Sequence, residues 1–232
     1  MPSSHGPTLR ELTVQALSSV EHGYDLLAPK FDHTSFRTPA NILTATTAAL
    51  ASFGPFDDGL DVCCGTGAGL SVLDAVCRSR VTGVDFSTGM LDEARQANPG
   101  AGLVRADALT LPFRAGFDLA VSFGALGHFL PAERPALFAG IHRALRPGGV
   151  FAMPLGGPPP VTSRWFWMTL GFDAVMRVRN AVWRPKFVMY YRTTPIPAVL
   201  TDLRAAGFHT ETVPLPLPGL SYELVVARRA AG

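Results

Sequence analysis

Short apolar runs alternate with stretches of helical periodicity between residues 57 and 154. This alternation is typical of βα units, which pack helices against a mostly parallel sheet. The fourth run is nearly continuous in apolar residues, as expected for a strand that is buried on both faces. The predicted strands are 60–64, 81–85, 103–107, 117–123 and 150–153.

Apolar residues recur at helical spacing after three of these strands. Such spacing places them on one face of a helix, which can then pack on the sheet. The pattern predicts helices around 70–77, 90–94 and 137–145. A turn at Pro147-Gly148-Gly149 is expected to end the last of these helices.

The pattern changes on both sides of this core. Residues 1–50 look helical and are expected to cover one edge of the sheet. A rigid linker rich in Gly and Pro opens a segment of different character, 156–196, which we call the lid. The βα pattern then resumes with a helix at 197–206, which Gly207 should stop. Two strands around a Pro-rich turn are expected to close the chain, 208–213 and 222–227.

A length of 232 residues fits one domain, and 47% hydrophobic residues suffice for a substantial core. The expected parts of this domain are a helical cap, a ligand-binding core, the lid, and a C-terminal helix with strands: 1–50, 55–155, 156–196 and 197–232. The charges nearly balance, at 20 Lys and Arg against 18 Asp and Glu. A general nucleic-acid binder usually carries a basic excess, so we expect no nucleic-acid partner.

The cysteines, Cys63, Cys64 and Cys77, lie too close together for the disulfide framework of a secreted protein. No paired Cys or His at zinc-ligand spacing is present, so no metal is expected. The N-terminus has no apolar signal core and no apolar run is long enough to span a membrane. We therefore expect a cytoplasmic protein.

A glycine-rich turn follows the first predicted strand, with the sequence DVCCGTGAG at 61–69. Such a turn lets the backbone approach a ligand closely, although dehydrogenases and purely structural turns share it. The third glycine of a nicotinamide-binding turn is replaced by Leu70, and no P-loop lysine follows. Asp61 at the strand end suits a ligand that carries positive charge rather than a pyrophosphate.

Three aspartates close successive predicted strands, Asp61, Asp85 and Asp107. Open α/β sheets bind ligands at the carboxyl ends of their strands. Asp85 is placed to accept bonds from the two hydroxyls of a ribose, and Asp107 from an adenine amino group. A single aspartate at such a position is as often a helix N-cap. Three of them beside a glycine turn favour a ligand site.

The ordered segments DVCCGTG (61–67), GVDFSTGM (83–90), RADALTLPF (105–113) and LRPGG (145–149) resemble the motifs of class I methyltransferases that use S-adenosylmethionine (SAM). They are most similar to the type 11 methyltransferase domain, the branch that includes ubiquinone and menaquinone C-methyltransferases. The resemblance covers about residues 55–155. Cys63 departs from it, since the family usually has glycine there.

The resemblance implies a Rossmann-like, seven-stranded, mostly parallel α/β sheet with helices on both faces, an antiparallel last strand and a helical lid after the fifth strand. It also implies SAM and its product S-adenosylhomocysteine (SAH) as ligands. Tyr24 resembles an N-terminal aromatic residue that closes over SAM, although it could equally be core. The cofactor-binding residues expected on these grounds are Tyr24, Asp61, Cys63, Gly65, Thr66, Gly67, Asp85, Phe86, Met90, Asp107, Ala108, Phe123 and Gly124.

His128 follows the fourth predicted strand, where the methyl acceptor should lie. Its ordinary pKa near neutrality makes it the candidate catalytic base, needed only if the acceptor loses a proton. It could instead shape its loop or touch SAM. His22 and His33 are weaker candidates in the cap, and Arg37 could hold an acidic group of the substrate.

Residues 163–192 combine basic and aromatic side chains and hold a single acidic residue, Asp173. The stretch could be a lid helix with solvated arginines, a frame for an acceptor that is apolar or both apolar and anionic, or a surface that docks transiently on a membrane. Its candidate substrate contacts are Trp165, Tyr190 and Tyr191.

The predicted function is transfer of the methyl group of SAM to a small, apolar or lipid-like acceptor, on an O, C or N atom. The proximity of activated donor and acceptor supplies most of the catalysis in such a reaction. The alternatives are a non-catalytic SAM-binding sensor or partner subunit, and an enzyme of the same fold with other chemistry, such as a cyclase. The protein is expected to be a monomer or a homodimer.

Overall fold

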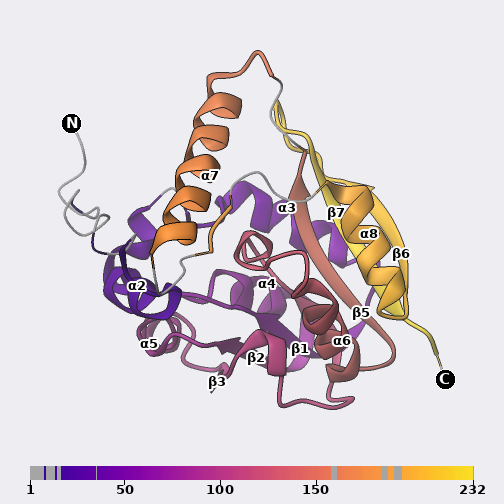
Figure 1. The fold of residues 1–232 in the computed structure, drawn as a ribbon. Helices are drawn as coiled ribbons and strands as arrows, with labels where there is room; N and C mark the ends of the chain where they lie inside the picture. Colours follow the sequence, from indigo (N-terminus) through magenta and orange to yellow (C-terminus); the bar gives the residue numbers. More distant parts are fainter. Residues whose placement is uncertain are drawn as a thin grey trace.

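The computed structural model describes residues 8, 14, 17–34, 36–157, 161–183, 188–190 and 195–231. Seven strands form one sheet in the order β3-β2-β1-β4-β5-β7-β6 (Figure 1). They are β1 (Phe56–Val62), β2 (Cys77–Asp85), β3 (Gly102–Arg105), β4 (Phe117–Val121), β5 (Leu145–Gly156), β6 (Phe208–Pro214) and β7 (Tyr222–Arg229).

The pairs β1–β2, β2–β3, β1–β4 and β4–β5 are parallel, whereas β7 is antiparallel to both of its neighbours, β5 and β6. The predicted fold class, a mostly parallel sheet with a reversed last strand, is confirmed. The chain moves outward from β1 through β2 to β3 and then returns to the other side of β1 with β4. This reversal of strand order leaves a crevice at the carboxyl ends of β1 and β4, where open α/β sheets bind ligands.

Helices lie on both faces of the sheet (Figure 1). One face is covered by α6 and α8, and the other by α3, α4 and α5, so the sheet is buried between two layers. The α-helices are α2 (Val20–Leu27), α3 (Ala40–Leu50), α4 (Ala68–Val76), α5 (Thr88–Ala97), α6 (Arg134–Ala144), α7 (Arg164–Val182) and α8 (Ile196–Ala205). Short 3-10 helices are η1 (Ala28–His33), η2 (Ala108–Thr110) and η3 (Leu126–His128).

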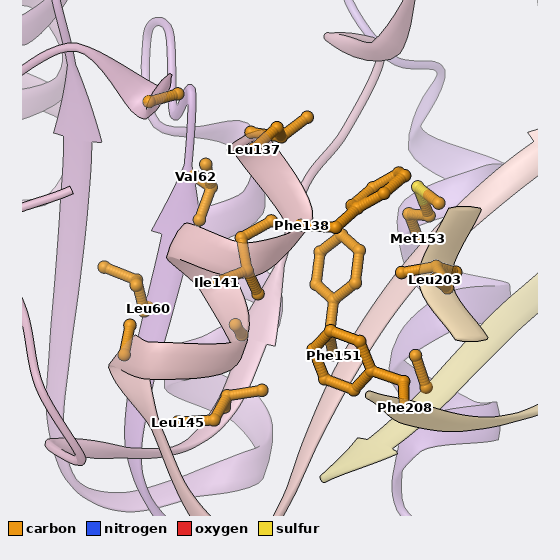
Figure 2. Close-up of a cluster of buried hydrophobic side chains, with 14 of the residues drawn as sticks. Leu60, Val62, Leu137, Phe138, Ile141, Leu145, Phe151, Met153, Leu203 and Phe208 are labelled. Carbon is orange, nitrogen blue, oxygen red and sulfur yellow. The ribbon is translucent and has the colours of Figure 1, made fainter. Parts of the chain in front are cut away.

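The strands distribute their side chains alternately between two apolar clusters. Phe151 of β5 points into the cluster under α6, and its neighbours Val150 and Ala152 point into the cluster under α4. Figure 2 shows the first cluster, in which the rings of Phe138 and Phe151 lie with centroids 6.3 Å apart. Each large apolar side chain buried in this way stabilises the fold by roughly 1.5–3 kcal/mol. The α6 residues that meet the sheet repeat at the helical spacing seen in the sequence, Leu137, Phe138, Ile141 and Ala144.

The predicted turn after α6 is wrong. β5 begins at Leu145, directly after the helix, so Pro147-Gly148-Gly149 lies within the strand. The pairing with β4 jumps from Phe117–Leu145 to Leu119–Val150, so the strand bulges across these residues. Gly148 adopts a positive φ of 78° there, which a glycine tolerates without strain.

The remaining element predictions differ from the structure mainly at strand ends. β1 and β2 begin about four residues earlier than predicted, and β3 and β4 end two residues earlier. The helix at 197–206 is confirmed as α8, and Gly207 follows its last turn with a φ of 94°, as a helix-stopping glycine does. The two closing strands and the helix after β5 are also confirmed. Within the described ranges, no helix is both long and apolar enough to cross a membrane.

Candidate functional site

A cavity of about 300 Å³ opens at the carboxyl ends of the central strands. Residues of four regions that are distant in sequence meet around it: the segment 20–38, the turn after β1, the ends of β2 to β4, and residues 188–189. The predicted cofactor residues that line it are Tyr24, Asp61, Cys63, Gly65, Thr66, Asp85, Phe86, Met90, Asp107, Ala108, Phe123 and Gly124. Arg37 and His128 line it as well.

The turn after β1 is built on a left-handed backbone. Cys63, Gly65 and Gly67 have φ values of 60°, 51° and 91°. Only glycine adopts this region without strain, so Cys63 is a strained position of the turn. Gly67 does not line the cavity. It faces α5, where an added Cβ would collide with the side chain of Asn98.

The Asp61 carboxylate is 1% exposed, and neither of its oxygens has a hydrogen-bond partner within the part of the chain that the structure describes. Burial, and secondarily the charge of Asp85, raise the pKa of Asp61 well above its ordinary value. Gly69 has no room for a side chain because the carboxylate of Asp61 and the ring of Phe123 occupy it. An unpaired buried carboxylate on a cavity wall is suited to a ligand that brings positive charge or hydrogen-bond donors.

The Asp85 carboxylate joins two loops of the site. It accepts hydrogen bonds from the backbone N–H of Gly65, at 2.9 Å, and of Ser87, at 3.0 Å. Burial raises the pKa of Asp85, although these bonds oppose the increase. The glycine turn and the start of α5 are therefore held together at the end of β2.

Asp107 satisfies both interpretations of an aspartate at a strand end. Its side chain accepts a hydrogen bond of 2.9 Å from the backbone N–H of Leu109 and so caps η2. The same residue lines the cavity. The N-cap interpretation is therefore correct here without removing Asp107 from the cavity wall.

Tyr24 and His128 are in contact at the cavity wall. The Tyr24 hydroxyl lies 2.9 Å from Nε2 of His128, and Nδ1 of His128 lies 2.7 Å from the Val188 carbonyl. A carbonyl can only accept, so Nδ1 carries the imidazole hydrogen and Nε2 accepts from Tyr24. Burial lowers the pKa of His128, against the opposing effect of the Val188 carbonyl. The imidazole is therefore neutral near pH 7 and able to take up a proton.

Two aspartates of the N-terminal segment, absent from the sequence prediction, fasten it to the cofactor loops. Asp25 accepts from the Ser87 hydroxyl, at 2.6 Å, and from the Gly89 N–H, at 3.0 Å. Asp32 accepts from the Thr66 hydroxyl at 2.7 Å. No local pattern marks either aspartate, because their partners lie more than 30 positions away.

Arg37 lines the cavity beside Asp32. Its Nε lies 3.3 Å from the Asp32 carboxylate but has no hydrogen-bond partner among the described residues, so the contact of Arg37 with an acidic substrate group stays a prediction. His33 is the last residue of η1, and neither His33 nor His22 lines the cavity.

The predicted substrate contacts of the lid are only partly placed at the cavity. Val188 and Met189 line it, whereas Tyr190 does not. The Tyr190 N–H donates to the Gly127 carbonyl at 3.0 Å, and its ring lies 4.5 Å from the Arg177 guanidinium carbon. Tyr191 and the side chain of Trp165 lie outside what the structure describes.

Much of the remaining cavity wall is apolar. Among the residues that the sequence analysis did not single out, it includes Val20, Phe31, Phe36, Phe129, Val188 and Met189. Across the described residues, no group of three or more His, Cys, Asp or Glu could hold a metal ion.

The methyltransferase domain family matches residues 60–153. The chain is 38% identical over 103 residues to an uncharacterized methyltransferase of Synechocystis sp., a match that covers 44% of this chain and 48% of that protein. It thus spans about half the length of the curated relatives it matches.

Two solved structures illustrate the shared fold. A SAM-dependent methyltransferase of Methanosarcina mazei has a TM-score of 0.62 at 17% identity, covering 79% of this chain and 98% of that chain. The [4+2]-cyclase SpnF has a TM-score of 0.65 at 18% identity, covering 92% of this chain and 96% of that chain. The family match shows a methyltransferase domain of the class I SAM-dependent kind over residues 60–153, and the two solved structures show that the chain has the same fold.

Proposed function

We propose that this protein transfers the methyl group of SAM to a small, apolar or lipid-like organic acceptor. The observation that carries the proposal is the Asp61 carboxylate, which is buried on the cavity wall without a hydrogen-bond partner among the described residues. SAM carries an ammonium group and a sulfonium, and would supply the positively charged partner that this carboxylate does not have among the described residues.

The other cavity residues fit the same ligand. The Asp85 carboxylate is anchored by two N–H donors and has acceptor capacity left for the hydroxyls of a ribose. Phe86 and Met90 supply an apolar surface for an adenine, with Asp107 and Ala108 beside it. The volume of about 300 Å³ lies at the lower end of the range for small-molecule sites.

The acceptor is proposed to be apolar because the remaining wall offers aromatic and aliphatic side chains. Two charged residues interrupt this wall: Arg37 lies 3.3 Å from the Asp32 carboxylate, and Glu133 accepts from the Leu130 N–H at 2.7 Å. Arg37 could hold an acidic group of an otherwise apolar acceptor. Val188, Met189 and Phe129 would exclude water around the reacting atoms.

Bound SAM supplies an activated methyl group, so the protein has mainly to position the acceptor and keep the site dry. This chemistry needs no metal Lewis acid, and we propose that none takes part. If the acceptor is a hydroxyl, its proton passes to the Tyr24 oxygen as the Tyr24 hydroxyl proton moves to Nε2 of His128. The imidazole then becomes an imidazolium, and Tyr24 remains a neutral phenol.

The site is tested by calorimetric titration of the purified protein with SAM and SAH. We expect micromolar binding for the wild type and no detectable binding for Asp85→Ala. Asp61→Asn is the second variant, because Asp85 also holds two loops and its loss could disturb the fold. Asp92→Ala, an exposed aspartate on α5, is the matched control and should bind as the wild type does. A folded wild-type protein that binds neither ligand would overturn the proposal.

A second candidate function is a cyclisation or other reaction on the same fold without methyl transfer. It is favoured by the likeness to SpnF, which extends over 92% of the chain. Methyl transfer and cyclisation are distinguished by whether SAH forms from SAM in the presence of apolar acceptors. Acceptor turnover without SAH would support the second candidate, and SAM binding without any turnover would indicate a sensor or partner subunit.

We propose that the protein works in the cytoplasm. Cys63, Cys64 and Cys77 are all free thiols, as is usual in a reducing compartment. We propose that the protein works as a monomer or a homodimer and has no nucleic-acid partner.

A further inference from the structure

The helix α7 buries its polar side chains and exposes its apolar ones. Its buried positions are Thr169, Asp173, Met176 and Asn180, spaced by four, three and four residues along one helical face. Three of these four side chains are polar. A helix on the surface of a globular protein normally shows the opposite distribution.

The outward face of α7 consists of large apolar residues. Trp167, Val178 and Val182 are 62%, 66% and 80% exposed, and Met168 and Val175 lie on the same side of the helix. Trp167 and Met168 are adjacent in the chain, and Met168, Val175, Val178 and Val182 follow at separations of seven, three and four residues, so the set lies along one side of the helix. An exposed apolar stripe of this extent marks an interaction surface.

The charges on and beside the stripe are positive. Arg164 lies on the exposed side at the first turn of α7, and Arg177 is exposed on the flank of the helix, with its guanidinium carbon 4.5 Å from the Tyr190 ring. The single acidic residue of the helix, Asp173, is on the buried face. The stripe therefore presents apolar side chains and arginines together, and it offers no carboxylate of its own.

We propose that the outward face of α7 docks the protein on an anionic lipid bilayer. Lipid phosphates complement the arginines, and the valines, Met168 and Trp167 enter the boundary between head groups and acyl chains. A second copy of the chain is a poorer partner for this face. It would bring further arginines to Arg164 and Arg177 without a carboxylate from the same face to pair with them.

Docking in this way would use the outer face of a helix whose inner face adjoins segments that line the cavity. Figure 1 shows α7 standing away from the sheet layers with α2 near its C-terminal end. Arg179 donates to the Ser18 carbonyl at 3.1 Å, and the Asn180 amide lies 3.5 Å from the Tyr190 hydroxyl. Val20 and Met189, within two residues of Ser18 and Tyr190, line the cavity. The inner face of α7 is therefore close to the cavity wall, and the docking itself does not depend on methyl transfer.

The test is flotation of the full-length protein with vesicles of phosphatidylcholine alone or with 30–40% phosphatidylserine, about the range in which surface charge attracts basic segments strongly. The protein should bind the anionic vesicles and bind those of phosphatidylcholine at least about tenfold more weakly. Tryptophan emission is a second measure, because all three tryptophans, Trp165, Trp167 and Trp183, lie in or directly after α7. Their emission should shift to the blue on binding.

The double variant Val175→Ser/Val178→Ser should bind anionic vesicles at least about tenfold more weakly, since apolar surface that enters the bilayer is lost. Leu220→Ser, an exposed apolar residue in the turn between β6 and β7, is the matched control and should bind as the wild type does. SAH binding should be unchanged in both variants, which separates this test from that of the methyltransferase site. Absence of vesicle binding, equal binding by the double variant, or a dimer that the double variant dissociates would each overturn the proposal.

Discussion

The Ser87 hydroxyl donates a hydrogen bond of 2.6 Å to the Asp25 carboxylate, and this bond joins α2 to the start of α5. Ser87 is completely buried. The Gly89 N–H donates to the same carboxylate, and an added Cβ at Gly89 would lie only 3.1 Å from the Asp25 backbone. Because α2 also carries Tyr24, the Asp25 contacts set how the N-terminal segment covers the cavity.

Replacement of Asp25 by Ala should therefore weaken both the fold and the ligand site. It leaves the buried Ser87 hydroxyl and the Gly89 N–H without their acceptor, which costs about 1–3 kcal/mol of unfolding free energy. We expect SAH affinity to fall by about tenfold, since a loss of 1.4 kcal/mol in binding is a factor of ten. Denaturant unfolding and calorimetry measure the two effects.

The control for this prediction is Asp92→Ala. Asp92 pairs with Arg95 at the surface of α5, and exposed pairs of this kind contribute little. Equal losses of stability in the two variants would mean that Asp25 is not a structural link between α2 and α5.

Asp61→Asn is expected to stabilise the protein without ligand. The raised pKa of Asp61 means that its ionised form is disfavoured in the folded state, so at pH 7 its charge lowers stability. Removal of this charge should raise the free energy of unfolding by about 1–2 kcal/mol, or the melting temperature by roughly 2–8 °C. The same variant should bind SAH more weakly.

The pH dependence of stability tests independently whether the Asp61 charge destabilises the folded protein. As pH falls through the raised pKa, the wild-type carboxyl becomes neutral and its cost disappears. The difference in stability between Asp61→Asn and the wild type should therefore shrink toward acid pH. A variant that melts below the wild type at pH 7 would show that Asp61 has a stabilising partner in the free protein.

Most of the sheet could be predicted from the sequence because its signals are local. Apolar runs mark the strands, and the carboxyl ends of parallel strands meet at one edge. Asp61, Asp85 and Asp107 were therefore expected near one another before any coordinates, and all three line the same cavity. Gly67 was expected there too, but its place is decided by Asn98 of α5, which no local pattern reveals.

The contacts that complete the site depend on tertiary structure. Asp25 and Ser87 are 62 residues apart in the chain, and Asp32 and Thr66 are 34 apart. The ion pair of Arg37 with Asp32 likewise depends on the fold of the N-terminal segment. The burial of α7 could not be predicted either. Its aromatic and apolar residues recur at a spacing that usually marks the inner face of a helix, but here much of that apolar surface is exposed.

Cys63→Gly should leave the free energy of unfolding almost unchanged, whereas Cys64→Gly should lower it. The φ of 60° at Cys63 costs a non-glycine residue roughly 1–2 kcal/mol, and glycine loses a similar amount through greater freedom of the unfolded chain. We expect a change within about 1 kcal/mol. Cys64→Gly relieves no such strain and removes a buried side chain. Its free energy of unfolding should therefore fall by about 1–2 kcal/mol more than that of Cys63→Gly. A Cys63→Gly variant as unstable as Cys64→Gly would contradict the proposed strain.

The pKa of His128 is expected to lie below that of an ordinary histidine. Burial lowers its pKa, so its imidazole should remain neutral to pH values below the ordinary 6.5. Nuclear magnetic resonance of the ring hydrogens measures this directly, and His128→Gln identifies which of the six histidine signals is lost. Since the unfolded state binds a proton more readily, His128 should lower wild-type stability as pH falls below about 6.5. His128→Gln should remove that part of the decline.

Catalysis should follow the same titration if the acceptor loses a proton. The rate would then fall on the acid side only below pH 6.5, as His128 becomes protonated and can no longer accept from Tyr24. Tyr24→Phe and His128→Gln should each lower kcat by about 10²-fold or more, with little change in SAH affinity. His22→Gln, at an exposed histidine of α2 that does not line the cavity, is the matched control and should leave kcat unchanged. A flat pH profile with kcat unchanged in Tyr24→Phe would mean that methyl transfer needs no base, and His128 would then serve to hold Tyr24 against the loop that carries Val188.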